Sequence, residues 1–408
     1  MKSKIVELTQ EELNLIQGYI KVSEENIKKS PISTEEMYQL ANDYLTGNNE
    51  IKQDDRKAFY WFCKAALEGY PEAIDSMGKC FSDGIGVEYN ASNAFYWFTK
   101  MAEWGSSRSQ NNLGWSYESG EGVSQNDEKA AYWYRKAAEQ GNAMAQYNLG
   151  FCYEYGRGVL QDKVEAFNWY LKAAKQGKAI AQYYVGTYFE LGQVVNKDNS
   201  EAFKWYKLSA EQGYPKAQGS LGLCYEEGQG VSKDEKQAFS WYMKAAEKGH
   251  ITSQFNLALC YEYGKGTEVD FEKAVKWYKE AAIEGYIFSM TNLGLCYEFG
   301  RGVEKSYEEA FSWYEKAANQ GDIEAIYNLA LCYEMGKGVP KDLLKAFEGY
   351  TKAAENGHGN AKNNLGRFYY HGFGIQKNDA IARKLWEESV AMGSIEAKEN
   401  LKVLKGGI

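Results

Sequence analysis

The sequence predicts an all-α solenoid built from about ten consecutive helix–turn–helix units of 36 residues. The first observation is a glycine that recurs every 36 residues from Gly69 to Gly393 without an insertion. The second is that each interval holds two stretches with apolar residues at helical spacing. The third is length, because 408 residues exceed what one hydrophobic core usually serves, whereas an array grows by stacking. With 15% aromatic residues and only 4 prolines, the chain has material for a continuous core and few helix breakers.

The first helix of each unit presents one apolar face. In the unit 143–177, Ala145, Leu149, Cys152 and Tyr153 fall at i, i+4, i+7 and i+8, which places them on one side of a helix. A Gly-x-Gly loop follows, and its glycines suit the positive φ of a helix C-terminus. They recur as Gly120 and Gly122, Gly156 and Gly158, Gly228 and Gly230, Gly264 and Gly266, Gly300 and Gly302, and Gly336 and Gly338.

The second helix begins at a column of residues that are favoured as N-caps. These are Asp54, Asn90, Asn126, Asp162, Asp198, Asp234, Asp270, Ser306, Asp342 and Asn378. Four positions further on, every unit has an alanine, which leaves room for a neighbouring helix. A tryptophan followed by tyrosine or phenylalanine widens the apolar face, so we expect this helix to be buried on two sides. The tryptophans are Trp61, Trp97, Trp133, Trp169, Trp205, Trp241, Trp277 and Trp313.

The two ends of the array should differ from its middle, because a single helix pair cannot cover its own apolar surface. Residues 37–70 lack both loop glycines and have Asn48 and Glu50 in their places. Residues 394–404 keep the first-helix pattern but have no second helix after them, as a capping helix would. The expected organisation is an N-terminal capping helix segment at residues 1–35, ten repeats at 36–393, and a C-terminal capping helix with a tail at 394–408.

Two capping boxes precede the array. Thr9 and Glu12 form the first, and Ser33 and Glu36 form the second. The first predicts an additional N-terminal helix over roughly residues 10–29.

Charge and cysteine usage limit the class of partner. The net charge of −9 argues against nucleic acid, which requires clustered Lys and Arg, and favours a basic or neutral protein. The sequence shows no apolar leader and no apolar run that could span a membrane, so we expect no membrane insertion and a cytoplasmic location. Six cysteines share one repeat position, too far apart for disulfides, so we expect small buried thiols. They are Cys80, Cys152, Cys224, Cys260, Cys296 and Cys332.

The sequence offers no visible site for catalysis. His250 and His358 share the repeat position just beyond a helix-ending glycine, which favours a surface loop over a metal site. The stretches GKGT at 264–267 and GKGV at 336–339 are the repeat's own turn and lack the Walker spacing. The carboxylates recur evenly and do not cluster as an acid/base pair. We therefore predict a protein that is not an enzyme, with no catalytic residue, no metal and no cofactor.

The string A-x-x-x-L-G-x-x-Y-x-x-G-x-G-V, followed by D-x-x-x-A-x-x-W-Y-x-K-A-A-x-x-G, resembles the Sel-one-like repeat (SLR) family, a relative of the tetratricopeptide repeats. The resemblance extends over about residues 37–404. It implies a right-handed superhelix that serves as a scaffold or adaptor for protein partners. The alternative is a cysteine-containing SLR hydrolase, or a protein that binds peptidoglycan fragments or β-lactams. Those relatives resemble disulfide-stapled secreted proteins, and this chain lacks their paired cysteines.

In the related tetratricopeptide repeats, the outer side of the first helices lines a concave groove, and two columns of this chain fall there. An acidic column would attract a basic partner, and the alternative is a solvated face that keeps the protein soluble. Its members are Glu118, Glu154, Glu190, Glu226, Glu262, Glu298 and Glu334. An asparagine column would hold a peptide backbone, and the alternative is a bond to a neighbouring helix. Its members are Asn112, Asn148, Asn256, Asn292, Asn328 and Asn364.

Two consecutive units interrupt the asparagine column, with Tyr183 and Tyr184 in one and Gly219 and Ser220 in the next. Our hypothesis is a pocket in which the tyrosines and the small residues receive one partner side chain, because aromatic anchors dominate interface energetics. The alternative is simple divergence of the repeat.

Two rows of apolar residues also lie on the outer side of the first helix. They are either the floor of a groove or contacts between units, and we favour contacts, because stacked helices have little uncovered perimeter. One row is Phe151, Leu223, Leu259, Leu295 and Leu331, and the other is Tyr155, Tyr263, Phe299 and Met335.

Overall fold

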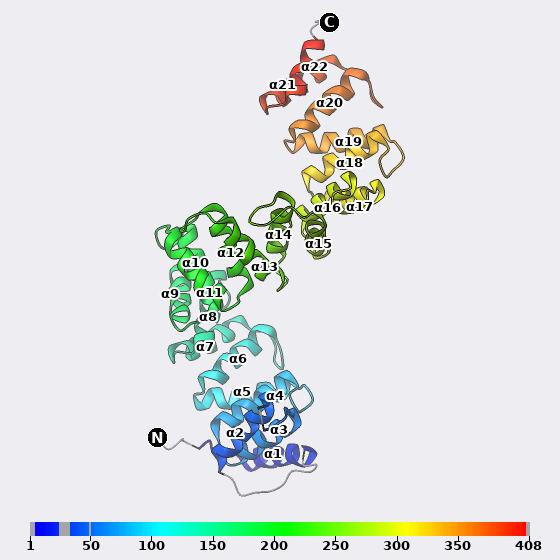
Figure 1. Ribbon diagram of the computed structural model, residues 1–408. Helices are drawn as coiled ribbons and strands as arrows, with labels where there is room; N and C mark the ends of the chain where they lie inside the picture. Colours follow the sequence, from blue (N-terminus) through cyan, green and yellow to red (C-terminus); the bar gives the residue numbers. More distant parts are fainter. Residues whose placement is uncertain (1–4, 24–32, 49, 405–408) are drawn as a thin grey trace. The chain divides into compact units, whose positions relative to one another are not determined.

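The computed structural model describes residues 5–23, 33–48 and 50–404, and these residues form 22 α-helices and no strand. The predicted all-α solenoid is thereby confirmed. The chain divides into two compact units, Met1–Ser209 and Ala210–Ile408. Within each unit, consecutive helices pack against one another (Figure 1). We call the first helix of each repeat its A helix and the second its B helix.

The first unit begins with an additional helix, α1 (Gln10–Ser23), which precedes the repeats. Its A helices are α2 (Thr34–Thr46), α4 (Pro71–Asp83), α6 (Ser107–Ser119), α8 (Ala143–Tyr155) and α10 (Ala179–Leu191). Its B helices are α3 (Asp55–Leu67), α5 (Ala91–Trp104), α7 (Asp127–Glu139) and α9 (Lys163–Lys175), and the B helix α11 (Asn199–Glu211) includes the boundary between the units.

The second unit continues the same alternation and ends on one helix without a B partner, α22 (Ile395–Leu404), which packs against α21 and α20. Its A helices are α12 (Pro215–Glu227), α14 (Ile251–Tyr263), α16 (Ile287–Phe299), α18 (Ile323–Met335) and α20 (Gly359–His371). Its B helices are α13 (Glu235–Ala246), α15 (Phe271–Ile283), α17 (Tyr307–Asn319), α19 (Leu343–Glu355) and α21 (Asp379–Ala391).

The predicted N-cap column is confirmed in all ten B helices. The Asp162 carboxylate accepts hydrogen bonds from the backbone N–H groups of Val164 and Glu165 at the start of α9. The other nine caps accept backbone N–H groups in the same way. Because the first N–H groups of a helix lack partners within it, these side chains fix where each B helix begins.

The loop glycines have the predicted positive φ, which is 69° at Gly156 and 66° at Gly158. The second glycine also has a steric role. A Cβ atom on Gly158 would lie 2.0 Å from the carbonyl oxygen of Asp127, the first residue of the preceding B helix. The second loop glycine therefore lets successive repeats approach through their backbones.

Tyrosines of the B helices form the centre of the core. Each has at most 1% of its surface exposed: Tyr134, Tyr170, Tyr206, Tyr242, Tyr278, Tyr314 and Tyr350. Five of these rings lie against a glycine of the A helix, and a Cβ atom on Gly150 would be 2.8 Å from the Tyr170 ring. The expected burial on two sides thus holds for these tyrosines but only in part for the preceding tryptophans. Trp61, Trp97 and Trp313 are buried, and the other five are half-buried. A lysine covers some of these rings, as where Lys172 Nζ lies 3.6 Å from the centre of the Trp169 ring.

Both predicted capping boxes are present. Thr9 N–H donates to Glu12 at 2.7 Å, and Glu12 N–H donates to the Thr9 hydroxyl at 3.3 Å. Glu12 is also buried and accepts from Tyr96 and Lys100 of α5 at 2.8 and 2.9 Å, which ties α1 to the array. The predicted N-terminal helix begins at residue 10 and ends at residue 23, and the rest of its expected span lies outside the described residues.

All seven cysteines are buried thiols. Burial raises the pKa of Cys152 and Cys260 to about 12. Such thiols stay protonated at neutral pH and pack as small apolar groups.

Candidate functional site

The glutamate column lies near the C-terminal ends of the A helices, and each of its carboxylates is partly buried. In six of the seven repeats, the buried tyrosine 16 residues later donates its hydroxyl to the glutamate. The distance is 2.5 Å for Tyr278 and Glu262 and 2.8 Å for Tyr314 and Glu298. These carboxylates are therefore not simply solvated, because six of them accept hydrogen bonds from buried tyrosine hydroxyl groups.

Five of the seven glutamates also form an ion pair with a basic residue of the next repeat. In four of these pairs, the cation is the residue between the two loop glycines of that repeat. The pairs are Arg157 with Glu118 (3.6 Å), Lys265 with Glu226 (2.9 Å), Arg301 with Glu262 (3.5 Å), Lys337 with Glu298 (2.7 Å) and Arg367 with Glu334 (2.5 Å). Burial alone would raise the pKa of Glu226, but the hydrogen bonds from Lys265 and Tyr242 outweigh it and hold that pKa below its usual value.

The asparagine column lies between the A helices of successive repeats. Asn148 Nδ2 donates to Asn111 Oδ1 of the preceding A helix at 3.0 Å, and Asn364 contacts Tyr327 at 3.5 Å. Asn292 instead donates to the backbone carbonyl of Phe288 in its own helix. Asn112 and Asn256 are partly exposed, and Asn328 is buried, with an amide nitrogen that has no partner. At least three of these amides are thus engaged within the fold, and whether the column binds a peptide stays a prediction.

The tyrosine pair of the fifth repeat packs among other aromatic rings. Tyr184 stacks on Tyr170 with ring centres 4.9 Å apart, and it lies 5.9 Å from Tyr147. Tyr183 lies 5.7 Å from Tyr206. Both tyrosines are partly buried, and Tyr170 covers one face of the Tyr184 ring.

The space beside Gly219 is occupied by a histidine. A Cβ atom on Gly219 would lie 2.8 Å from the His250 ring and 2.7 Å from the Ser253 hydroxyl. His250 Nδ1 in turn lies 2.8 Å from that hydroxyl. The small residue in this repeat therefore accommodates His250, which precedes α14, and whether the tyrosine pair helps to form a pocket stays a prediction. His358, at the equivalent position, accepts the Ala361 N–H and caps α20.

The last residues of several A helices are exposed and apolar, and we call them the apolar row. They are Tyr155, Leu191, Tyr263, Phe299 and Met335, with 55 to 63% of their surface exposed. The expectation of contacts between neighbouring repeats concerned Tyr155, Tyr263, Phe299 and Met335, and more than half of the surface of each makes no such contact. Each residue is the last of its A helix and directly precedes the glycine that ends the helix. The other predicted apolar row, which begins with Phe151, was expected to make internal contacts. Its members Leu259, Leu295 and Leu331 do pack against the core.

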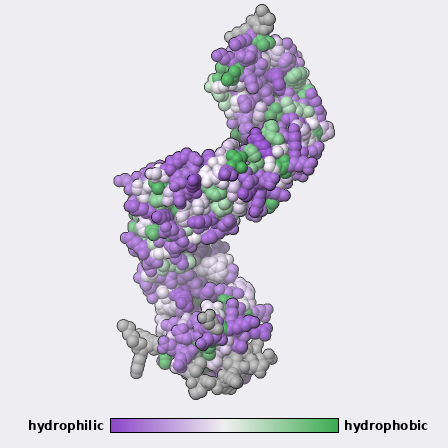
Figure 2. Space-filling view, in the orientation of Figure 1, coloured by the Kyte–Doolittle hydropathy of each residue, from purple (hydrophilic) through white to green (hydrophobic). Residues whose placement is uncertain are grey.

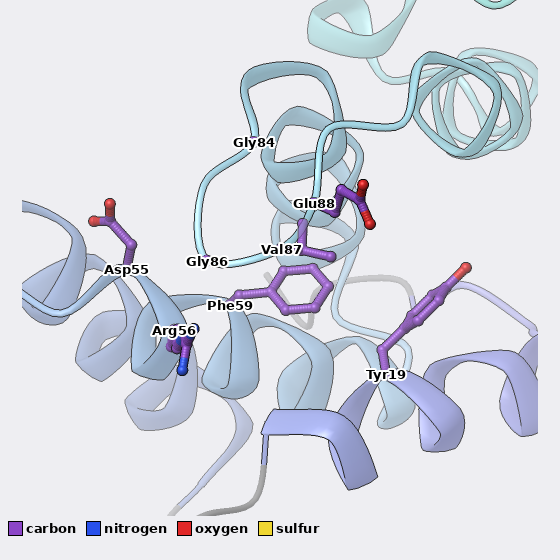
Figure 3. Close-up of a pocket in the computed structure, with 8 residues that line it drawn as sticks. All are labelled: Tyr19, Asp55, Arg56, Phe59, Gly84, Gly86, Val87 and Glu88. Carbon is purple, nitrogen blue, oxygen red and sulfur yellow. The ribbon is translucent and has the colours of Figure 1, made fainter.

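A groove that sequence reasoning did not predict recurs between the start of a B helix and the loop of the next repeat. Figure 3 shows the first one, where Phe59 and Val87 lie between Tyr19 of α1 and the polar residues Asp55 and Arg56. Its volume is about 670 Å³. Equivalent grooves lie beside Gly156 to Leu160 and beside Gly264 to Glu268. The sequence did contain a signal for these grooves, because the N-cap residue of one repeat and the Gly-x-Gly loop of the next recur at a fixed spacing.

Two further features concern metal ligation and membrane-spanning helices in the described part of the chain. No group of three metal-ligating side chains comes together among those residues. Within the same residues, no helix has the length and apolar character needed to cross a membrane. Figure 2 shows that the visible face is mostly hydrophilic, with hydrophobic residues scattered among polar ones.

The repeated helix pairs and the face along their A helices define an α-solenoid repeat protein. The family model described as Sel1 repeat matches ten consecutive segments that together extend from residue 37 to residue 394. The chain therefore belongs to the Sel1 repeat family. Proteins built from Sel1 repeats generally mediate protein–protein interactions and are typically not catalytic.

Two of the solved structures that are similar to this chain are also repeat proteins of this kind. One is c5321, a protective antigen of uropathogenic Escherichia coli strains that displays an SLR fold. It is 29% identical, with a TM-score of 0.54, over 97% of this chain and 91% of its own. The other is a Sel1 repeat protein from Oxalobacter formigenes, which is 37% identical, with a TM-score of 0.54, over 60% of this chain and 96% of its own. No curated protein matches the chain.

Proposed function

We propose that this protein is a non-catalytic scaffold that binds a basic or neutral protein or peptide along the outer face of its A helices. The observation that carries the proposal is the apolar row. Large apolar side chains that are more than half exposed and recur with the repeat favour a surface that a partner covers. The glutamate column lies next to this row in the same helices.

The arrangement combines two kinds of contact. The apolar row supplies buried area, and the neighbouring carboxylates supply orientation and selectivity for positive charge. Because Tyr278 and its equivalents hold the carboxylates in fixed positions, a partner would not have to immobilise those side chains.

The test is a triple variant of the second unit, Tyr263→Ser, Phe299→Ser and Met335→Ser. The matched control replaces Val269, Ile283 and Leu344 by serine, because these side chains are 54 to 64% exposed but lie outside the A helices. Both variants remove three exposed apolar groups and should melt within a few degrees of the wild type.

Affinity capture from native lysate, followed by mass spectrometry, is the measurement. We expect the A-helix variant to lose a protein that both the wild type and the control retain. Retention of the same proteins by all three would contradict the proposal that this face binds the partner.

A further inference from the structure

Two consecutive glutamates of the column lack the cation that the others have. The basic residue between the loop glycines is Arg157, Lys265, Arg301 or Lys337 in the repeats that form this pair. The same position, 39 residues after Glu154 and Glu190, holds Gln193 and Gln229. Among the described residues, no lysine or arginine pairs with either glutamate. The amide of Gln193 accepts from Lys163 Nζ at 2.9 Å.

The hydrogen bonding around Glu154 differs as well. Tyr170 is the tyrosine that would donate to Glu154 by analogy with the other repeats, but its buried hydroxyl has no hydrogen-bond partner. Tyr188 of the next A helix donates to Glu154 instead. It occupies the repeat position where six other repeats have a cysteine. A fully buried hydroxyl without a partner costs free energy, so the packing here differs from that of the regular repeat.

Aromatic rings surround this carboxylate. Tyr184 stacks on Tyr170, and both lie within 6 Å of Tyr147. Tyr155, the next residue after Glu154, is 55% exposed and packs on Phe151 with ring centres 4.6 Å apart. A carboxylate without a cation, beside tyrosine rings, attracts a cation through charge and through the ring faces together.

We propose that Glu154, together with Tyr155 and Tyr184, receives a lysine or arginine side chain of the protein partner. The side chain would stand where Arg301 or Lys337 stands in other repeats, so the partner completes a pair that the chain leaves open. Glu190 offers a second uncompensated carboxylate one repeat further on, which suits a partner segment with two basic residues. This inference rests on the proposed scaffold function and specifies the chemistry of its partner.

The probe is a fluorescein-labelled octapeptide of alternating lysine and alanine, measured by fluorescence anisotropy against the full chain at low ionic strength. The reference peptide has glutamate in place of lysine. We expect the lysine peptide to bind at least tenfold more tightly than the reference, and we expect added salt to weaken it.

Two variants of the full chain test the site. Gln193→Lys supplies the missing internal cation and should weaken the lysine peptide at least fivefold. Glu154→Gln removes the charge, keeps an acceptor for Tyr188 and should have a similar effect.

The control for Gln193→Lys is Gln125→Lys, because Gln125 is exposed and lysine stands at that repeat position in residues 197, 233, 305 and 341. The control for Glu154→Gln is Glu226→Gln, because Glu226 already has Lys265 as its partner.

Both controls should change the affinity less than twofold. Equal weakening by Gln193→Lys and Gln125→Lys would overturn the inference, because only the total charge would then matter. No preference for the lysine peptide would overturn it as well. If the inference fails while the apolar-row variant still loses its partner, the scaffold function stands without this site. If the apolar-row variant keeps every partner, the scaffold function fails whatever the peptide does.

Discussion

Glu154 and Glu262 occupy the same position of two Sel1 repeats but have different surroundings. Glu262 accepts a hydrogen bond from Tyr278 and pairs with Arg301, and only 9% of its side chain is exposed. Glu154 accepts from Tyr188, has no basic partner in the described residues, and leaves Tyr170 without a hydrogen bond.

A glutamate in this column is therefore not a binding site by itself. Its role depends on the residue that the following repeat places beside it, which in four pairs stands between the loop glycines and in one is Arg367 of α20. Where that residue is basic, the glutamate joins two repeats, and where it is glutamine, the charge remains available. The central repeats thus differ from those of the second unit in electrostatics and packing, although the backbone pattern is the same.

The largest expected effect concerns the second loop glycine. Gly302 has a φ of 67°, and a Cβ atom there would lie 2.1 Å from the carbonyl oxygen of Phe271, so Gly302→Ala should destabilise the second unit by about 3 kcal/mol. The central repeat already has Val194 in this column, packed against its core cluster. Val194→Ala should cost only about 1 kcal/mol. Urea unfolding of both variants measures the difference, and equal costs would show that the two loops are built alike.

The next effect concerns the core tyrosines. Tyr278→Phe removes the donor to Glu262 and should cost about 1.5 kcal/mol, because a partly buried carboxylate loses a hydrogen bond. Tyr170→Phe removes a hydroxyl that has no partner and should be neutral or slightly stabilising. Thermal unfolding of the two variants provides the measurement. A similar loss at both sites would mean that Tyr170 is bonded in solution as its equivalents are.

The smallest effect concerns the pH dependence of an ion pair. The pKa of Glu226 lies below its usual value in the folded protein, so its contribution to stability is present above the ordinary carboxylate pKa and is lost as the pH falls through the folded pKa. Lys265 is partly exposed, so Lys265→Gln should cost only about 0.5 kcal/mol at neutral pH. That cost should disappear in acid, once Glu226 is protonated. The measurement is the urea midpoint of the wild type and of Lys265→Gln at neutral and at acidic pH. A stability cost that persists in acid would show that Lys265 stabilises the fold through packing and not through the ion pair.

The local features of the fold were predictable from the sequence because each depends on few neighbouring residues. Asp162 needs only the N–H groups of the next turn, and Gly156 needs only a conformation that other residues avoid. These positions recur every 36 residues, so the ten repeats and their helix order followed directly.

The candidate site was predictable only in part. The column of glutamates was evident, but its bonds join residues 16 and 39 positions apart, and they depend on how the helices pack. Basic residues recur between the loop glycines, and their absence at Gln193 and Gln229 was a readable signal. Tyr170 could not have been singled out, because the sequence does not show that Tyr188 takes its partner. Reversing the charge of Glu262 or Glu298 would disturb this internal network as well as the surface.

The bonds between repeats have a further consequence for how such a protein can change over generations. Gln176 reaches the Gly141 carbonyl over 35 residues, Asn148 reaches Asn111 over 37, and Lys265 reaches Glu226 over 39. All of these connect one repeat only to the one before it. A gene segment that encodes 36 residues could therefore be duplicated or deleted, and the new junction would find the same partners on both sides. The chain can lengthen or shorten by whole repeats, while single substitutions such as those at residues 193 and 229 give individual repeats their own character.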